Sequence, residues 1–325
     1  DNPDYLCDAY SFSHMEIATS DSTSLQVKAL QVFQQLVQLH SKTKNYKALV
    51  AVDIERLKFI YANAVFADKD TQLLNALQEA AENIKENESA AMYLFEAASV
   101  LKTQGDTFST ENDMHRWKLK EAKSLCDKIN SQYPKSRGAA KCEILKVEIT
   151  NKVIRLTAEQ HVPINQASRI LVNYKNFEAL SLKAYKITQA QKTALHDLYP
   201  IQKQHAYITK LPVVKTWNAK LKNEGDYQNH SIEIPVPNLE NGQYVILASS
   251  EKSSQKDPSE NDFAFSFLQA TNLVLTETRT AKKHIFQVID RNTGKPKKGT
   301  KITLYYKRNY RGSVLKKKLV SDANG

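Results

Sequence analysis

The chain has 325 residues, of which 41% are hydrophobic and 25% are charged, and its formal net charge is +11. This length exceeds one ordinary hydrophobic core, so two or three globular domains are expected. No apolar run approaches the roughly 20 residues that span a bilayer, which excludes a transmembrane helix, and three cysteines are too few for a disulfide scaffold.

The first 150 residues predict helices, because apolar residues recur with the 3.6-residue period of a single helix face. The clearest stripes lie in residues 25–37, 49–61, 73–84 and 91–101. A capping-box pattern from Thr110 to Asp113 predicts the start of a fifth helix, with Trp117 on its apolar face, and a sixth helix is expected after Pro134. Together these starts indicate stacked antiparallel pairs, a helical-repeat-like domain whose spacing exceeds the 34 residues of tetratricopeptide repeats.

Two of the three cysteines, Cys126 and Cys142, lie at equal sequence distances on either side of Pro134. If Pro134 marks a turn between antiparallel helices, the two thiols face each other. A disulfide needs Cα atoms within about 7 Å, which is tighter than usual helix packing. Two buried free thiols are therefore the favoured reading, and a disulfide is the alternative.

After about Asn151 the hydrophobic period changes from 3.6 to 2, which indicates β-strands. Ile170, Val172 and Tyr174 alternate with Leu171 and more polar residues, and a similar strand follows at residues 179–187. One helical interruption, broken by a proline, is expected at about residues 192–211. Short strands with turn signals every ten or so residues suggest β-sandwiches, one over residues 151–270 and a second from residue 271 onward.

The positive charge is concentrated at the end of the chain, where residues 271–325 contain 14 Lys and Arg against 3 Asp and Glu. Basic residues interleaved with tyrosines could bind a phosphate backbone and stack bases. The favoured reading is the solvated face and the turns of a β-domain, because the lysines fall largely in a turn and at polar alternate positions. No nucleic-acid partner is therefore predicted.

Turn residues also dominate this last part of the chain. Residues 290–296 contain Asp, Asn, Gly and Pro at hairpin spacing between the alternating runs "HIFQVID" and "TKITLYY". The chain closes on "SDANG", a second turn signal, where another strand is expected to follow. The sequence is therefore interpreted as part of a longer protein.

A strand, then D-x-x-T-G-x-P, a second strand and a closing D-x-x-G resemble the second macroglobulin domain of bacterial alpha-2-macroglobulins. The matching residues are Asp290, Thr293, Gly294 and Pro296, followed by Asp322 and Gly325. Residues 167–187 are similar to the first macroglobulin domain, and "FAFSFLQATNLVLTE" resembles the strand that leads from the first domain to the second. The resemblance covers residues 151–325, whereas the helical region resembles a lineage-specific addition.

With this resemblance, the predicted fold class is α+β multidomain. An all-α helical-repeat-like domain of antiparallel helix pairs (1–150) is followed by all-β Ig-like macroglobulin sandwiches, one complete (151–270) and one truncated (271–325).

The resemblance implies protease inhibition by entrapment, with this chain as a non-catalytic structural part of the inhibitor. Its implied partners are host or environmental proteases, met through the whole protein, and other domains of the same chain. The implied location is the periplasm or the cell envelope, with any anchor outside these residues. The reactive thioester of some relatives needs Cys-x-Glu-Gln, whereas here Cys142 is followed by Glu143, Ile144 and Leu145. Neither a thioester nor a bait segment is assigned.

No catalytic, cofactor or metal site is predicted. The chain contains no Gly-rich phosphate loop, HExxH, CxxC or GxSxG motif. The spacing of His196 and His205 across Pro200 is not ligand spacing, so packing or exposed histidines are expected. Trp117 is expected in the core, while the role of Trp217 is left open. The alternatives are an envelope binding or adhesin protein with Ig-like modules and a helical peptide-binding groove, or an enzyme whose catalytic domain lies outside these residues.

Overall fold

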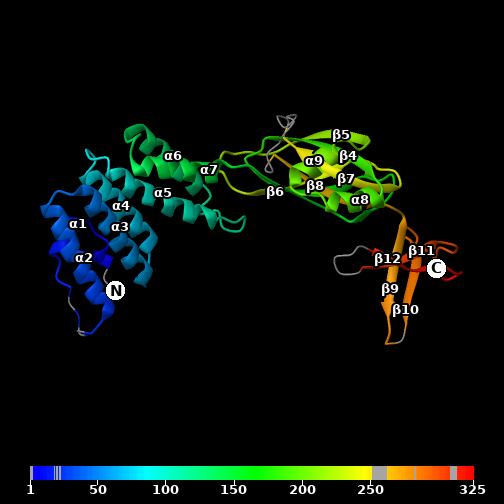
Figure 1. The fold of residues 1–325 in the computed structure, drawn as a ribbon, viewed down its shortest axis with the longest axis horizontal. Coiled ribbons are helices and arrows are strands. Elements are labelled where there is room, and N and C mark those ends of the chain that lie inside the picture. Colours follow the sequence, from blue (N-terminus) through cyan, green and yellow to red (C-terminus); the bar gives the residue numbers. More distant parts are fainter. Residues whose placement is uncertain are drawn as a thin grey trace. The chain divides into compact units, whose positions relative to one another are not determined.

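The computed structural model describes residues 3–250, 262–281, 283–307 and 313–325, apart from residues 18, 20 and 22. The chain forms two compact units, coloured along the sequence in Figure 1. One comprises Asp1–Asn151 with Asn223–Asn229, and the other Lys152–Lys222 with His230–Gly325. The predicted order, helices first and strands after them, is confirmed. The division into three domains stays a prediction.

The first unit is helical and contains the apolar stripes predicted from the sequence. Its elements are the 3-10 helix Pro3–Tyr5 and the helices α1 (Ala9–His14), α2 (Leu25–Lys42), α3 (Tyr46–Asn63), α4 (Lys69–Asn83), α5 (Ala90–Asp106), α6 (Lys118–Gln132) and α7 (Arg137–Thr150). One core lies among α1 to α5 and a second among α5 to α7. Among the described residues, no helix is both long enough and apolar enough to cross a membrane.

The fifth predicted helix begins later than the capping-box pattern indicated. Ser109 and Asn112 close a turn through two backbone hydrogen bonds, and the Asn112 N–H also donates to Ser109 Oγ. These local bonds compete with a helical start at Thr110. Helix α6 begins only at Lys118, so the predicted capping box is wrong.

A buried guanidinium group holds the N-terminal segment, for which no element was predicted. Arg56 on α3 is fully buried, and its Nε lies 2.7 Å from Asp53 Oδ1, one turn earlier. Its two terminal nitrogens donate to the carbonyl oxygens of Tyr5 and Cys7, each at 2.7 Å. The guanidinium carbon also lies 4.4 Å from the ring centroid of Phe12. The Arg56 side chain therefore contacts both the backbone carbonyls and the Phe12 ring of the N-terminal segment.

The same network reaches two further helices. Tyr93 on α5 donates its hydroxyl to Asp53 Oδ2 at 2.7 Å. Burial, and then the charge of Asp53, raise the pKa of Tyr93 well above its ordinary range. From α2, Gln34 donates its amide to the carbonyl oxygens of Phe12 and Met15. Polar side chains of α2 and α3 thus bind the N-terminal segment directly, and α5 joins the same network through Asp53.

Residues Asn223–Asn229 pack as part of the helical unit although they lie between two strands in the sequence. Arg116 donates to Asp226 Oδ2 at 2.9 Å and also pairs with Glu224. Gln228 donates its side-chain amide to the carbonyl oxygens of Gly105 and Arg116, and Tyr227 packs against the core of α5 to α7. These hydrogen bonds hold the segment in the helical unit. No local pattern in the sequence indicates them.

The second unit begins with two facing sheets. Its elements up to residue 270 are β1 (Val153–Ala158), β2 (His161–Val162), β3 (Ser168–Lys175), β4 (Ala179–Ile187), α8 (Gln189–His196), α9 (Ile201–Ile208), β5 (Val213–Lys220), β6 (His230–Val236), β7 (Gly242–Ser249) and β8 (Phe263–Ala270). The three-stranded sheet has the order β1-β3-β6, and the five-stranded sheet has the order β2-β8-β7-β4-β5.

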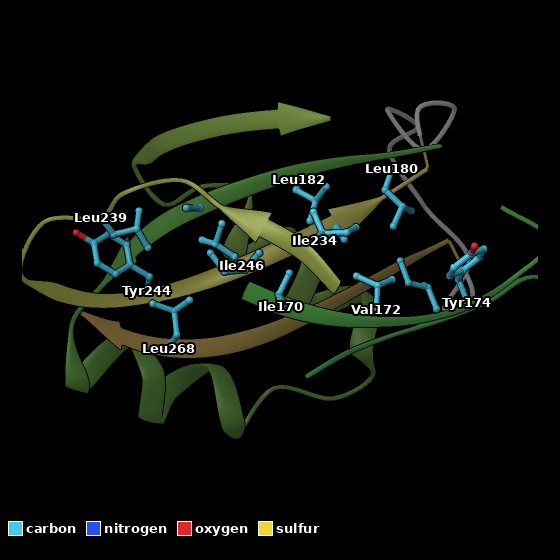
Figure 2. Close-up of a cluster of buried hydrophobic side chains, with 14 of the residues drawn as sticks. Ile170, Val172, Tyr174, Leu180, Leu182, Ile234, Leu239, Tyr244, Ile246 and Leu268 are labelled. Carbon is cyan, nitrogen blue, oxygen red and sulfur yellow. The ribbon is translucent and has the colours of Figure 1, made fainter. Parts of the chain in front are cut away.

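A shared core lies between these sheets, as Figure 2 shows. Ile170, Val172 and Tyr174 enter it from β3, whereas the neighbouring Leu171 is 37% exposed, which confirms the alternation predicted for this strand. Leu180 and Leu182 enter the core from β4. The arrangement is a β-sandwich in which strand alternation selects the inward side chains.

The opposite face of the five-stranded sheet is also covered. Val245 and Leu247 of β7 pack there with Leu195 of α8 and Ile208 of α9, while Tyr244 and Ile246 face the sandwich core. A strand buried on both faces needs a continuous apolar run, which explains the "YVILA" stretch in β7.

The final part of the second unit consists of β9 (Leu273–Arg279), β10 (His284–Asp290), β11 (Lys301–Lys307) and β12 (Ser313–Val320). In the described residues, β9 pairs with β10 and β11 pairs with β12, both antiparallel.

We predict that Arg56→Met lowers the free energy of unfolding by about 3–5 kcal/mol, because it leaves the Asp53 carboxylate buried without its ionic partner. The measurement is urea unfolding followed by circular dichroism, together with amide exchange in residues 5–12, which should accelerate.

The matched control is Lys58→Met on the same helix. Lys58 pairs with Glu96 at 2.9 Å but is 48% exposed, so the loss should stay within about 1 kcal/mol. Equal losses for both variants would show that the buried network has no special role in stability.

Candidate functional site

The two cysteines singled out from the sequence come together on neighbouring helices. Cys126 lies on α6 and Cys142 on α7, both are fully buried, and both are free thiols in the structure. A hydrogen bond between the two thiols lowers the pKa of Cys142, and the same bond raises the pKa of Cys126. The remaining cysteine, Cys7, is half-buried, and burial raises the pKa of its thiol.

The two histidines flanking Pro200 lie on different helices and stack on aromatic rings. The His196 ring centroid is 5.4 Å from that of Phe267, and the His205 centroid is 4.6 Å from that of Phe263. Burial, and then the charge of Lys183, lower the pKa of His205. Across the described ranges, no group of three or more His, Cys, Asp or Glu side chains could hold a metal ion.

The two tryptophans have different surroundings. Trp117 is 43% exposed and lies beneath the cationic groups of Arg116 and Lys120, each 5.2 Å from a ring centroid. The predicted core position is therefore wrong, because the helix begins after Trp117 and its side chain does not follow the apolar stripe. Trp217 on β5 packs against the sandwich core, and its Nε1 is buried without a hydrogen-bond partner.

An apolar cleft among α3, α4 and α5 was not predicted from the sequence. Its volume is about 250 Å³. Ile54 and Leu57 of α3, Leu73 and Leu77 of α4, and Val100 of α5 line it. The stripes predicted all of these residues except Val100 as core, and only the packing of the three helices shows that their side chains leave space between them.

Polar groups also line this cleft. Some of them have hydrogen-bond partners within the protein, and one does not. Tyr61 donates its hydroxyl to Asp70 at 2.7 Å, and the Thr107 hydroxyl lies 2.9 Å from His115 Nδ1. By contrast, Gln104 Oε1 is buried without a hydrogen-bond partner. The apolar lining of the cleft can therefore accept an apolar group.

The turn after β10 is organised by the Asp290 carboxylate. Its Oδ1 accepts hydrogen bonds from the backbone N–H groups of Asn292 and Thr293 and from the Thr293 hydroxyl. Its Oδ2 lies 3.0 Å from Lys297 Nζ. This ion pair, followed by the hydrogen bonds within the turn, lowers the pKa of Asp290 to about 2. Gly294 has a φ of +67°, a conformation that side chains rarely adopt.

The closing residues of the chain meet the same strand. The Val288 N–H donates to the carbonyl oxygen of Gly325 at 2.7 Å, and the Gln287 amide donates to that of Asn324. Gly325 has a φ of +85°, and a Cβ placed on it would lie 2.4 Å from the Val288 carbonyl oxygen. Both pieces of the D-x-x-T-G-x-P and D-x-x-G pattern are thus in contact with β10.

The turn expected between the two alternating runs is present, but the strands that carry these runs, β10 and β11, pair with β9 and β12. Asp290 donates its N–H to the Lys295 carbonyl and Lys297 donates to the Val288 carbonyl, but the strands that the turn joins pair elsewhere. Pro296 has no N–H to extend the ladder. The turn is confirmed, and the pairing of the two runs as one hairpin is wrong.

We predict that the Asp290 carboxyl titrates near pH 2 in the folded chain, below its ordinary pKa of about 3.9. Because the folded pKa is depressed, its contribution to stability is fully present above the ordinary pKa and is lost as the pH falls through about 2. The measurement is the carboxyl carbon shift during an NMR titration.

Lys297→Gln should move this midpoint upward, because it removes the largest cause of the shift. Lys298→Gln is the matched control and should leave the midpoint in place. A midpoint that stays near pH 2 in Lys297→Gln would show that the ion pair is not the cause.

No protein-family model matches the chain, and no curated protein matches it. Among solved structures, a native alpha-2-macroglobulin from Escherichia coli spanning domains MG0-NIE-MG1 is 15% identical, with a TM-score of 0.38. The match covers 54% of this chain and 56% of that one, so the chain spans about half of that structure's length. A fragment of the same protein spanning NIE-MG1 is 12% identical over 54% of this chain and 85% of that one, again with a TM-score of 0.38.

The CARDB domain of the PF1109 protein from Pyrococcus furiosus is 12% identical over 37% of this chain and 88% of that domain, with a TM-score of 0.22. All three are distant likenesses.

Proposed function

We propose that the chain is a non-catalytic structural part of a bacterial alpha-2-macroglobulin-like protease inhibitor that acts by entrapment. Its partners would be host or environmental proteases and other domains of the same protein. Its location would be the periplasm or the cell envelope. This proposal rests on the motif pattern and on what the motif residues do in the fold.

The observation that carries the proposal is the meeting of the two motif pieces on β10. Asp290 satisfies the turn that contains Thr293 and Gly294, and Gly325 binds the backbone of Val288. These groups are used within the fold itself, so their role is to hold strands in register rather than to react with a substrate. The buried position of Cys142 in α7 likewise favours packing over the chemistry of an exposed reactive bond.

The test uses the whole protein to which the chain belongs, mixed with a broad-specificity protease. We predict that cleavage of a large protein substrate falls strongly while cleavage of a small chromogenic peptide persists, because a caged protease keeps an open active site. Serum albumin at equal mass serves as the control for simple substrate competition.

Equal residual activity on both substrates would contradict entrapment of that protease. Loss of both activities would indicate an inhibitor that blocks the active site directly, which also contradicts the proposal.

A second candidate function is peptide binding by the helical unit, as expected for an envelope binding or adhesin protein. The cleft among α3, α4 and α5 favours it, since leucine, isoleucine and valine side chains line it. The occupant would be a peptide segment that presents an apolar side chain.

We predict that N-acetylleucinamide shifts the methyl resonances of Leu57, Leu73 and Leu77 in a saturable manner. Its apolar side chain matches the apolar lining of the cleft. N-acetyllysinamide is the control and should leave these resonances unchanged. Identical responses to both compounds, or shifts without saturation, would remove this candidate.

A further inference from the structure

A cavity of about 380 Å³ lies at the edge of the five-stranded sheet, where residues of β2, β7, β8 and α8 line it. The edge strand β2 has only two residues, and it pairs with β8 only at Gln269 and Ala270. At this point the Gln269 N–H donates to the Gln160 carbonyl at 2.8 Å. In the described sheet, β8 has no strand partner on this edge before Gln269. The short edge strand therefore leaves space beside Phe267, which lines the cavity.

The ionisable side chains that line this cavity are all basic. Lys192 and His196 come from α8, and His161 comes from β2. Among the described residues that line the cavity, none is an aspartate or a glutamate. Glu159 and Asp197 lie near the histidines in the sequence but are not part of the lining. Because lysine is positively charged at neutral pH and imidazole can donate hydrogen bonds, this lining suits an anion.

The Phe267 ring positions two of these basic groups. Lys192 Nζ lies 4.8 Å from the ring centroid, and the His196 ring centroid lies 5.4 Å from it. The two residues are four positions apart on α8, which places them on the same face of the helix. In the part of the chain that the structure describes, no carboxylate forms an ion pair with Lys192. Its ammonium group can therefore pair with the charge of a ligand.

Side-chain amides add further hydrogen-bonding capacity to the lining. Gln160, Gln243 and Gln269 all line the cavity, and each amide can both donate and accept hydrogen bonds. The volume falls within the range of roughly 300–1,000 Å³ that is typical of small-molecule sites. Hydroxyl groups, which also donate and accept, match the amides, whereas an anionic group matches the basic side chains.

We propose that this cavity binds a small hydroxylated anion, either a sugar acid or a sugar phosphate. The anionic group binds Lys192 together with the imidazole groups of His161 and His196. The hydroxyl groups exchange hydrogen bonds with the glutamine amides. This site belongs to the strand-rich unit alone, and its binding does not depend on the proposed inhibitor function.

The test is a titration followed by NMR of the Phe267 and Gln269 backbone amides and the His196 ring. The probes are D-glucuronate, glucose 6-phosphate and the uncharged methyl glucoside. We expect saturable shifts with at least one of the two charged sugars, and the tighter of the two identifies the anionic group. Methyl glucoside should bind at least about tenfold more weakly, because it lacks the charge-assisted hydrogen bonds. Acetate and inorganic phosphate, which lack hydroxylated carbons, should also bind more weakly than the corresponding sugar.

Lys192→Gln should raise the dissociation constant of the charged sugar about tenfold, whereas Lys192→Arg, which keeps the charge, should largely retain binding. Lys203→Gln is the matched control, because Lys203 is exposed on α9 and does not line the cavity. Equal thermal midpoints of unfolding show that the variants keep the fold.

The proposal would be overturned if no charged sugar gave saturable shifts, or if methyl glucoside bound as tightly as the charged sugars. Equal losses in Lys192→Gln and Lys203→Gln would remove the role of Lys192 and with it the proposed site. Equal binding of acetate or inorganic phosphate and the corresponding sugar would contradict recognition of the hydroxyl groups.

Discussion

The helical unit depends on the requirement that a buried guanidinium group keep its hydrogen bonds. Arg56 has no access to water, so its charge is balanced by Asp53 and its donors are met by two backbone carbonyls of the N-terminal segment. A buried charge without partners costs several kcal/mol, and this cost determines the path of the chain before α1. Because Asp53 also accepts the hydroxyl of Tyr93, the arrangement of α5 depends on the same group.

In the strand-rich unit, the polar residues of the motif form hydrogen bonds within the unit's own turns. Asp290 orders the turn after β10, and Gly325 approaches the Val288 backbone where a side chain would collide. Side chains used in this way are not available for acid–base or nucleophilic chemistry, which supports a structural reading of the pattern. The cleft of the helical unit is different, because its buried Gln104 oxygen is left without a donor.

Several predictions from local pattern agree with the structure, and their failures share a cause. The alternation in β3 is confirmed because successive side chains of a strand must point to opposite faces. Thr110 and Trp117 were misplaced because a short turn between Ser109 and Asn112 delays the start of α6. The hairpin pairing expected around the turn at Asp290 was wrong because β10 pairs with β9 and β11 pairs with β12. In each failure a nearby or competing hydrogen bond outweighed a plausible local signal.

The amino-acid sequence by itself determined the order of helices and strands and most of the buried faces, because backbone geometry sets the direction of each side chain. It also contained the turn chemistry of Asp290 and Gly294. Only the tertiary structure decided which distant groups meet. Arg56 binds carbonyls 51 and 49 residues away, and Arg116 binds Asp226 at a separation of 110 residues. The cleft lining and the shared core of Cys126 and Cys142 have the same origin, because they require particular helices to pack at a particular register. No periodicity within a single element encodes that register.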